Sequence, residues 1–249
     1  MSVQTVLQIE NYFKSVHEFF KLKLKNFEML RLYHLPLSPF CRKVRLVLAE
    51  KKVEVELVEE RYWEQSPEFL KKSPSGKIPV LQLDGKLFTE SAPICELLED
   101  IYPQPKLMPD SAEERYEVRR LINWFDDKFH YEVTSKLLYE KINKKIMKQG
   151  APDSKNVMQG KRKIKYHLDY MTFLLERRRW LAGNSMTLAD FTAAAHFSTL
   201  DYTKDIDWIE SNTVKDWYAK IKSRPAFRSI LADQISGFPP SDHYNDLDF

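Results

Sequence analysis

Cysteine and glycine are both scarce in this chain of 249 residues, which contains two cysteines and six glycines. Two thiols, Cys41 and Cys95, cannot build a disulfide framework, so we expect a reducing compartment and a cytoplasmic protein. No apolar run approaches the roughly 20 residues needed to cross a bilayer, and we therefore expect no membrane partner. The chain also has almost no excess of charge of either sign, since 39 Lys and Arg are nearly balanced by 36 Asp and Glu. The net charge of +3 gives no reason to expect a nucleic-acid partner.

The six histidines show no spacing typical of metal ligands, so the sequence predicts no metal site.

The first 28 residues form an extension with apolar residues at helical spacing. They lack a basic segment followed by an apolar core, which excludes a secretory signal. Two acidic residues, Glu10 and Glu18, and the lack of arginine disfavour an organelle presequence. We interpret residues 1–28 as an added helix or an upstream start, with the folded body beginning at Met29.

The next segment, of about 75 residues, alternates between strand and helix patterns and predicts an α/β unit. Alternating apolar residues predict strands over residues 29–34 and 53–60, with a helix from near Arg42 to Lys51 between them. Asp84-Gly85 lies between two short apolar runs, which is the strongest local sign of a β-hairpin. The other predicted elements are a short helix opened by Ser66-Pro67-Glu68, hairpin strands at 79–83 and 86–88, and a helix over 90–100.

The second half of the chain is predicted to be all helical, after a linker at residues 102–110 that holds three prolines. Apolar residues at 3.6-residue spacing predict long helices over about residues 113–147 and 161–178. Thr187 and Asp190 have the spacing of a capping box, which predicts a helix start. The apolar run around residues 193–195 indicates that this helix is buried on most sides.

Ser38 opens the sequence Ser38-Pro-Phe-Cys41 between the first predicted strand and the helix that follows. A helix N-terminus favours negative charge and lowers the pKa of a thiol held there. A serine cannot exchange disulfides, but its hydroxyl can donate a hydrogen bond to a thiolate that a ligand brings in. Serine is also a common N-cap with no other role, and both interpretations stay open. Cys41 falls a turn inside the helix, so we expect its thiol to be buried.

Four motifs in a fixed order resemble the glutathione transferase superfamily, and the linker and third helix are most similar to its omega class. The motifs are Ser38-Pro-Phe-Cys-Arg-Lys-Val-Arg, Ser73-Pro-Ser-Gly-Lys-Ile-Pro-Val-Leu, Glu90-Ser-Ala-Pro-Ile-Cys and Leu107-Met-Pro-Asp. The resemblance implies a thioredoxin-like domain at residues 29–105, an all-α helical domain at 112–235 and a tail at 236–249. It also implies glutathione as co-substrate, a small electrophile as second substrate, and a homodimer.

The same resemblance assigns roles to individual residues. Ser38 falls on the catalytic position, Pro79 on a cis-proline, and Ile78 on the residue whose backbone pairs with the cysteinyl part of glutathione. Glu90 and Ser91 fall on the pair that binds the γ-glutamyl group.

Two departures from the omega pattern concern chemistry and affinity. Omega enzymes have a cysteine where Ser38 stands, so disulfide chemistry with glutathione should be absent here. They also have a lysine where this chain has Ser66, and Lys77 or Gln65 is then the candidate for the lost carboxylate contact.

Five residues of the first long helix are candidates for an apolar acceptor pocket, although aromatic residues at helical spacing more often form core. They are Trp124, Phe125, Phe129, His130 and Tyr131.

A second resemblance concerns the tail at residues 240–249 together with residues 61–64. Both are similar to a bacterial glutathione-transferase-like division protein that binds the tubulin homologue FtsZ. The alternative function is therefore a non-catalytic adaptor that binds FtsZ filaments. On this hypothesis Trp63 is an exposed interface anchor, and Tyr244, Leu247 and Phe249 either dock on a partner or belong to a loose terminus. We expect the tail to contribute little to the core.

Overall fold

The structure is a computed structural model that describes residues 30–247. The extension at residues 1–28, Met29 at the start of the first predicted strand, and Phe249 lie outside the described residues. No helix in the described part is long and apolar enough to cross a membrane.

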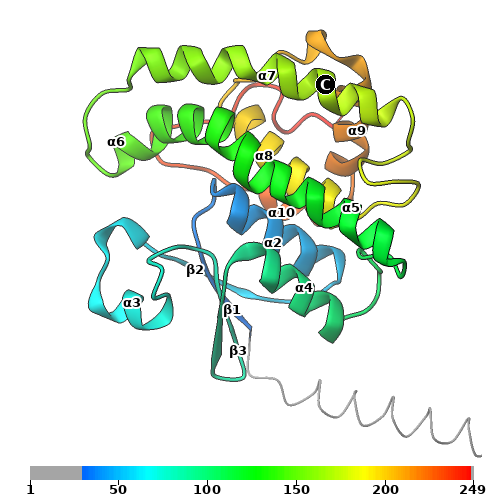
Figure 1. Cartoon of the computed structure of the whole chain (residues 1–249). Coiled ribbons are helices and arrows are strands. Elements are labelled where there is room, and N and C mark those ends of the chain that lie inside the picture. Colours follow the sequence, from blue (N-terminus) through cyan, green and yellow to red (C-terminus); the bar gives the residue numbers. More distant parts are fainter. Residues whose placement is uncertain (1–29, 248–249) are drawn as a thin grey trace, which may run out of the picture.

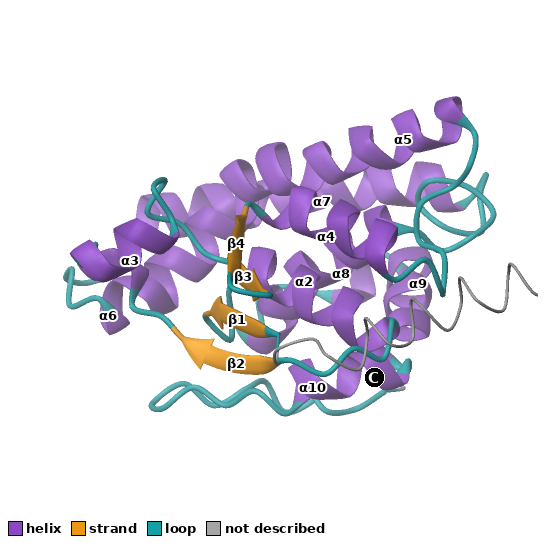
Figure 2. Ribbon diagram, turned by 90° about the horizontal axis from the view of Figure 1, so that it is seen from below, coloured by secondary structure: helices purple, strands orange, loops and turns teal. Residues whose placement is uncertain are grey.

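The first half of the chain contains a four-stranded sheet in the order β2-β1-β3-β4 (Figure 2). Its strands are β1 (Arg31–His34), β2 (Glu56–Glu59), β3 (Val80–Leu83) and β4 (Lys86–Thr89). β1 pairs with β2 in parallel and with β3 in antiparallel fashion, and β3 and β4 form an antiparallel hairpin. Asp84 and Gly85 both have positive φ angles, of 50° and 71°, as the tight turn of a hairpin requires. The hairpin predicted from these two residues is confirmed.

Two long helices of this half pack against each other: α2 (Pro39–Glu50) and α4 (Ser91–Ile101). α2 begins three residues before the predicted start, because Ser38 caps it and Pro39 takes its first position. The short helix predicted after Ser66 is confirmed as α3 (Pro67–Lys72). A single 3₁₀ turn, η1 (Tyr62–Glu64), was not predicted.

The second half is helical, as predicted, and lies above the sheet in Figure 1. The helix expected over residues 113–147 is one continuous path of α5 (Ala112–Asn123), η2 (Trp124–Asn143) and α6 (Lys144–Ile146), and η2 has the wider i→i+5 hydrogen bonding. The other elements are α7 (Ser154–Leu175), α8 (Leu188–Tyr202), η3 (Trp208–Glu210), α9 (Asn212–Lys222), η4 (Pro225–Phe227) and α10 (Arg228–Leu231). α7 begins earlier than predicted because the Asp153 side chain accepts from the N–H groups of its first turn.

α8 is the central helix of this half, and every one of its residues is buried. The capping box of Thr187 and Asp190 is present at its start, so both predictions for this helix are confirmed. α8 packs directly against α2 (Figure 1). One hydrophobic cluster therefore runs from Leu32 in the sheet through Val44 of α2 to Phe197 of α8.

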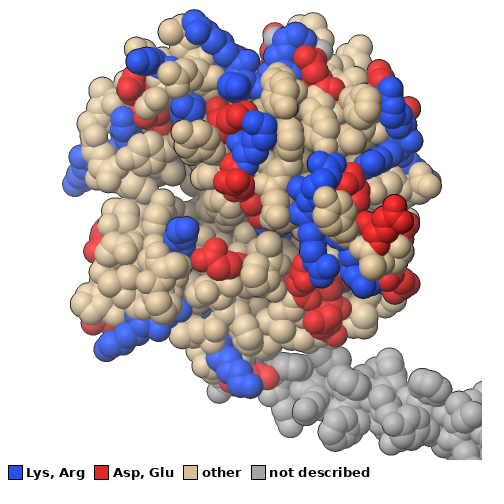
Figure 3. Space-filling view, viewed as in Figure 1, with Lys and Arg blue, Asp and Glu red and all other residues tan. Residues whose placement is uncertain are grey.

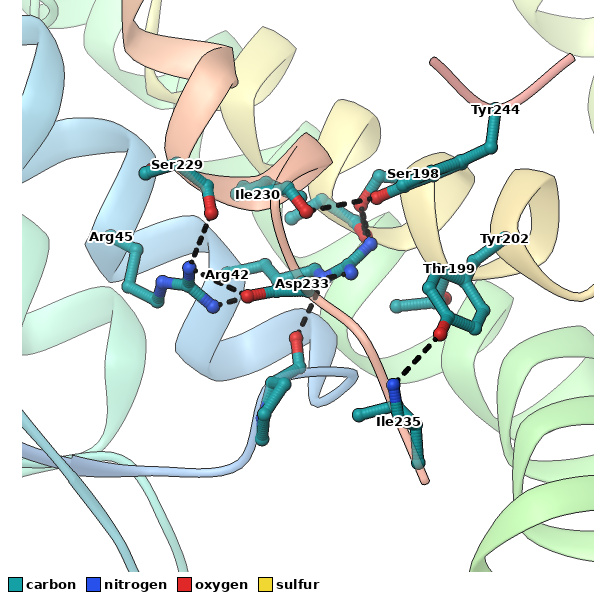
Figure 4. Close-up of polar contacts among 12 residues, drawn as sticks. Arg42, Arg45, Ser198, Thr199, Tyr202, Ser229, Ile230, Asp233, Ile235 and Tyr244 are labelled. Carbon is teal, nitrogen blue, oxygen red and sulfur yellow. Dashed lines mark hydrogen bonds and ion pairs between the residues drawn. The ribbon is translucent and has the colours of Figure 1, made fainter. Parts of the chain in front are cut away.

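A buried ion group joins the two halves at this contact (Figure 4). Arg42 and Arg45 of α2 both bind the carboxylate of Asp233, which follows α10. The Arg42 Nη2 lies 3.0 Å from Oδ2, and Arg45 donates to both oxygens at 2.9 Å. Arg42 is fully buried and also donates to Ser198 of α8 at 2.9 Å. Charges buried this deeply hold their geometry, because losing one partner leaves an unpaired charge inside the protein.

The C-terminal tail docks on its own chain, which contradicts our expectation that it adds little to the core. Tyr244 is 0% exposed, packs with Leu37, Leu138 and Ile142, and its hydroxyl donates to the carbonyl of Ile230 at 3.2 Å. The backbone of Ser241 also donates to the carbonyl of Tyr202 at 3.0 Å. Residues 240–244 are therefore part of the folded body rather than a loose terminus.

Replacing Tyr244 with alanine should destabilise the protein by about 3 kcal/mol or more, because the change empties a fully buried aromatic site. Leu247 provides a matched control in the same tail, since its side chain is 40% exposed. Leu247→Ala should change the free energy of unfolding by no more than about 0.5 kcal/mol. Urea denaturation measures both, and equal effects of the two substitutions would contradict the docked tail.

Candidate functional site

A cleft of about 1270 Å³ lies between the sheet half and the helical half. It opens as the hollow at the left of the molecule in Figure 3, between the regions of α3 and α6 labelled in Figure 1. Its walls come from the start of α2, η1, the start of α4, both halves of η2 with α6, and the segment after α10. Of the predicted site residues, Ser38, Lys77, Ile78, Glu90 and Ser91 border this cleft, whereas Pro79 does not.

Ser38 is both the N-cap of α2 and a cleft residue. Its hydroxyl oxygen accepts from the backbone N–H of Cys41 at 3.4 Å, so this hydrogen bond does not use the hydroxyl proton. The first turn of α2 contains no acidic residue, so no side chain there offsets the positive end of the helix. Ser38 can therefore act as the N-cap of α2 and, in the same position, donate a hydrogen bond to the thiolate of a ligand.

Cys41 is fully buried, as predicted from its place inside the helix. Burial raises the pKa of its thiol to about 11, although the Ser38 hydroxyl acts in the opposite direction. Burial likewise raises the pKa of Cys95 to about 12. Neither thiol borders the cleft. The chemistry available at the start of α2 is thus that of a hydroxyl and a helix terminus, and not that of a protein thiolate.

The Ile78–Pro79 peptide bond is cis, as predicted for a cis-proline. Within the described residues, the backbone N–H and C=O of Ile78 make no hydrogen bond, and Ile78 borders the cleft. The preceding residue is held firmly, since the Ser73 hydroxyl donates to the carbonyl of Lys77 at 2.8 Å. An unpaired backbone edge facing a cleft can add an extended peptide.

Glu90 and Ser91 stand at the start of α4, side by side on the cleft wall. Glu90 has a φ angle of 67°, a conformation that a residue with a side chain adopts only at a cost of about 1–3 kcal/mol. Its carboxylate makes no capping bond to α4, and one oxygen accepts from the Ser75 hydroxyl at 3.4 Å. An anionic group and a helix N-terminus therefore face the same part of the cleft.

Of the two candidates for the missing carboxylate contact, only Lys77 borders the cleft. The Gln65 amide is already engaged, because it donates to the carbonyl of Gly76 at 3.0 Å and to that of Tyr62. Ser66, at the position of the omega lysine, caps α3 by accepting from the N–H of Phe69 at 3.2 Å.

The aromatic residues predicted to line an acceptor pocket do not do so, with one exception. Phe125 and Phe129 are fully buried in the core, Trp124 packs against Tyr170, and Tyr131 is 71% exposed. His130 alone borders the cleft. Helical spacing is the same for core and pocket residues, so the pattern could not separate them.

The apolar part of the cleft comes from residues that the sequence did not single out. They are Leu37 before α2, Leu138, Ile142 and Ile146 on the second half of the long helix, and Ile235 after α10. The i, i+4 repeat of Leu138, Ile142 and Ile146 was a signal available in the sequence. Ile235 gave none, because a long-range contact holds it at the cleft: its N–H donates to the Tyr202 hydroxyl at 3.0 Å.

Trp63 was expected to be an exposed anchor, but it is only partly exposed. Its ring lies 5.6 Å from that of Tyr62, edge to face, and both rings border the cleft. Trp63 therefore belongs to the mouth of the cleft rather than to a separate surface.

Two protein-family models match the chain. "Glutathione S-transferase, N-terminal domain" matches residues 32–106, and "Glutathione S-transferase, C-terminal domain" matches residues 130–234. The resemblance read from the motifs and the fold class that it implied are confirmed.

The relatives that match include an FtsZ-localized protein as well as glutathione S-transferases. FtsZ-localized protein A of Caulobacter vibrioides is 46% identical over 222 residues, which are 88% of this chain and 97% of that protein. Glutathione S-transferase omega-1 of Rattus norvegicus is 26% identical over 208 residues, 82% of this chain and 81% of that protein. Among solved structures, a glutathione S-transferase from Rhodospirillum rubrum is 48% identical with a TM-score of 0.86, and FzlA from C. crescentus is 45% identical with a TM-score of 0.85. Each covers 89% of this chain and 100% of its own.

Both cysteines should resist alkylation in the folded protein. With the pKa values of Cys41 and Cys95 raised to about 11 and about 12, almost no thiolate exists at neutral pH, and neither sulfur is exposed. Iodoacetamide at about pH 7.5 should leave the native mass unchanged and add two labels after unfolding in urea. Rapid labelling of Cys41 in the native protein would show that the start of α2 activates a protein thiol after all.

Proposed function

Because this chain belongs to the glutathione S-transferase family, we propose that its cleft binds glutathione and holds the ligand's sulfur as a thiolate beside Ser38. The observation that carries the proposal is the convergence of different groups on one cleft. A serine hydroxyl at an uncompensated helix N-terminus faces it together with the unpaired backbone of Ile78 and the start of α4.

Each part of glutathione has a partner of suitable chemistry. The backbone of Ile78 pairs with the cysteinyl residue in the manner of an added strand. Ser91 and the N-terminus of α4 hold the γ-glutamyl carboxylate, and the carboxylate of Glu90 accepts from the ammonium group. The ammonium of Lys77 supplies the contact to the glycyl carboxylate.

The reaction follows from where the sulfur sits. The O–H of Ser38 and the positive end of α2 both stabilise a negative sulfur more than a neutral thiol, so the bound thiol loses its proton to solvent. The thiolate then attacks a small electrophile held in the apolar part of the cleft, by Leu138, Ile142 and Ile235. A cytoplasmic location and a homodimer complete the proposal, as the family resemblance implies.

Ser38→Ala should bind glutathione almost as well as the wild-type protein but turn over about 10- to 100-fold more slowly, because one hydrogen bond to a charged group is lost. Ser66→Ala is the matched control, since Ser66 is also an N-cap serine but does not border the cleft. Turnover with a generic electrophile and calorimetric binding of glutathione measure the two effects. Equal turnover by wild type and Ser38→Ala removes Ser38 from the chemistry.

A second candidate function is binding to FtsZ filaments as a non-catalytic adaptor. It is favoured by the relative named FtsZ-localized protein A, whose 46% identity extends over 97% of that protein's length. Trp63 is the candidate anchor, because a partly exposed tryptophan at the mouth of a cleft is typical of interface hot spots. The tail is a poorer candidate than it was from the sequence, since Tyr244 is used in the core.

Co-sedimentation with FtsZ filaments tests this candidate. Trp63→Ala should weaken binding by about 2 kcal/mol or more, as hot-spot truncations do. Tyr131→Ala should have no effect, because Tyr131 is highly exposed but lies away from the cleft. Failure of the wild-type protein to co-sediment removes the adaptor role, and equal weakening by both substitutions argues against Trp63 as the anchor.

A further inference from the structure

Positive charge is concentrated at one end of the helical half, where η2 and α6 lead into α7. Residues 136–165 contain ten Lys and Arg against two Asp and Glu, a net charge of +8, whereas the rest of the chain contains 29 against 34, a net charge of −5. The nearly balanced total therefore hides a strong separation of charge. This end lies at the upper left in Figure 1, and Lys and Arg side chains gather there in Figure 3.

Most of these cations have no acidic partner inside the protein. Both carboxylates of the segment are in use, because Glu140 is buried and binds Lys144, and the Asp153 side chain caps α7. Lys141 and Lys165 bind acids outside the segment. An anionic partner therefore meets cations that need not first leave an internal ion pair. The exposed side chains of this end that make no salt bridge within residues 30–247 are Lys145, Lys148, Lys155, Lys161, Arg162 and Lys163.

The first turns of α7 hold part of this charge on a fixed face. Lys155, Met158 and Arg162 are spaced i, i+3 and i+7 and are exposed, while the opposite face of the helix is buried. Gly160, on the buried face, lets α7 pack closely on η2, because a Cβ there would lie 3.0 Å from the side chain of Leu137. A well-packed helix therefore presents these charges.

The kind of cation at this end disfavours a protein partner. Five of the six unpaired cations are lysines, and lysine is depleted in protein–protein interfaces, whereas arginine is enriched there. The guanidinium group of arginine binds a single carboxylate or phosphate with two parallel hydrogen bonds, but a lysine ammonium is a hydrated point charge. Lysines therefore suit attraction to an extended surface that carries many anions.

The apolar residues among the cations favour lipid over nucleic acid. Met158 and Ile146 are 49% and 40% exposed, and such side chains can enter the region between headgroups and acyl chains but find no apolar partner on a phosphodiester backbone. Tyr166 is 51% exposed and could stack on a base. Its ring, however, already faces the ammonium groups of Lys128 at 5.5 Å and Lys163 at 6.0 Å.

We propose that the end of the helical half formed by residues 136–165 docks on a membrane surface rich in anionic phospholipid headgroups. The docking is peripheral and electrostatic, with the lysine and arginine side chains lying at the level of the headgroups. The sequence-based expectation of no membrane partner rested on spanning segments alone, and this surface requires none. The proposal does not depend on glutathione or on FtsZ, because Lys148 is the one cation of the six that borders the cleft.

Co-sedimentation of the full chain with lipid vesicles tests the proposal. Vesicles of phosphatidylglycerol and phosphatidylcholine should bind the protein, and vesicles of phosphatidylcholine alone should not. Raising the salt concentration from about 0.1 M to 1 M should abolish the binding, because the screening length falls from about 10 Å to about 3 Å.

The triple substitution Lys155→Gln, Lys161→Gln and Arg162→Gln should weaken vesicle binding by about 100-fold, since each cation near an anionic surface contributes about fivefold. The double substitution Lys155→Arg and Lys161→Arg keeps the charge and should retain the binding. All of these side chains are exposed, so the midpoint of thermal unfolding should stay at the wild-type value in both variants.

A matched control removes the same charge elsewhere. Lys71→Gln, Lys86→Gln and Arg228→Gln together alter two lysines and one arginine at exposed positions outside residues 136–165. This variant should weaken vesicle binding by no more than about threefold, because these cations do not lie at the docked end.

Four results would each overturn the proposal. The wild-type protein could fail to bind the phosphatidylglycerol vesicles, or bind phosphatidylcholine vesicles equally well. Equal losses in the two triple variants would show a general effect of net charge without a docking surface. Tighter binding of poly-L-glutamate or of a short single-stranded RNA than of the vesicles would assign the surface to an acidic protein or to a nucleic acid.

Discussion

The ion group of Arg42, Arg45 and Asp233 is the constraint on which the rest of this structure depends. It joins α2 to a carboxylate that follows α10 and lies 191 residues away from Arg42 in the sequence. The group carries two positive charges and one negative charge, and the excess is met by the carbonyl of Pro36, the carbonyl of Ser229 and the Ser198 hydroxyl. Two guanidinium groups without Asp233 would be buried and unpaired, so α2 and the C-terminal segment cannot separate at low cost (Figure 4).

This linkage determines the shape of the cleft. Ser38 stands at the start of the helix that carries both arginines, and Ile235 follows two residues after their carboxylate partner. Asp201, in α8, holds the next part of the segment, because its side chain binds His243 at 2.9 Å and its carbonyl accepts from the Ser241 hydroxyl at 2.8 Å. The C-terminal segment is therefore a wall of the candidate site and a part of the core at the same time.

The cleft divides into two parts of different chemistry. The sheet half supplies charges, helix N-termini and an unpaired backbone edge, all suited to a charged peptide. The helical half supplies most of the aliphatic side chains and one neutral imidazole, together with a few polar residues such as Asp126, Asp127 and Lys148. The two candidate functions use this same cleft, since Ser38 is the residue proposed for chemistry and Trp63, at the mouth, is the residue proposed for filament binding.

Local patterns in the sequence determined much of the fold. The Asp84-Gly85 hairpin, the capping serine of α3 and the capping box of α8 depend on contacts within a few residues, and each was predicted correctly. The motif series placed Ser38, Ile78 and Glu90 near one another because it reflects a known family geometry.

Only the tertiary structure decided which side chains of a helix are core and which line the cleft. Phe129 and His130 are adjacent and share one helical pattern, yet Phe129 is fully buried and His130 faces the cleft. The docking of Tyr244 was equally hidden, because its partners Leu37 and Leu138 lie more than a hundred residues away and no local period marks it. The sequence thus determined the elements and their caps through short-range geometry. Long-range packing and the buried charges of α2 decided the walls of the site.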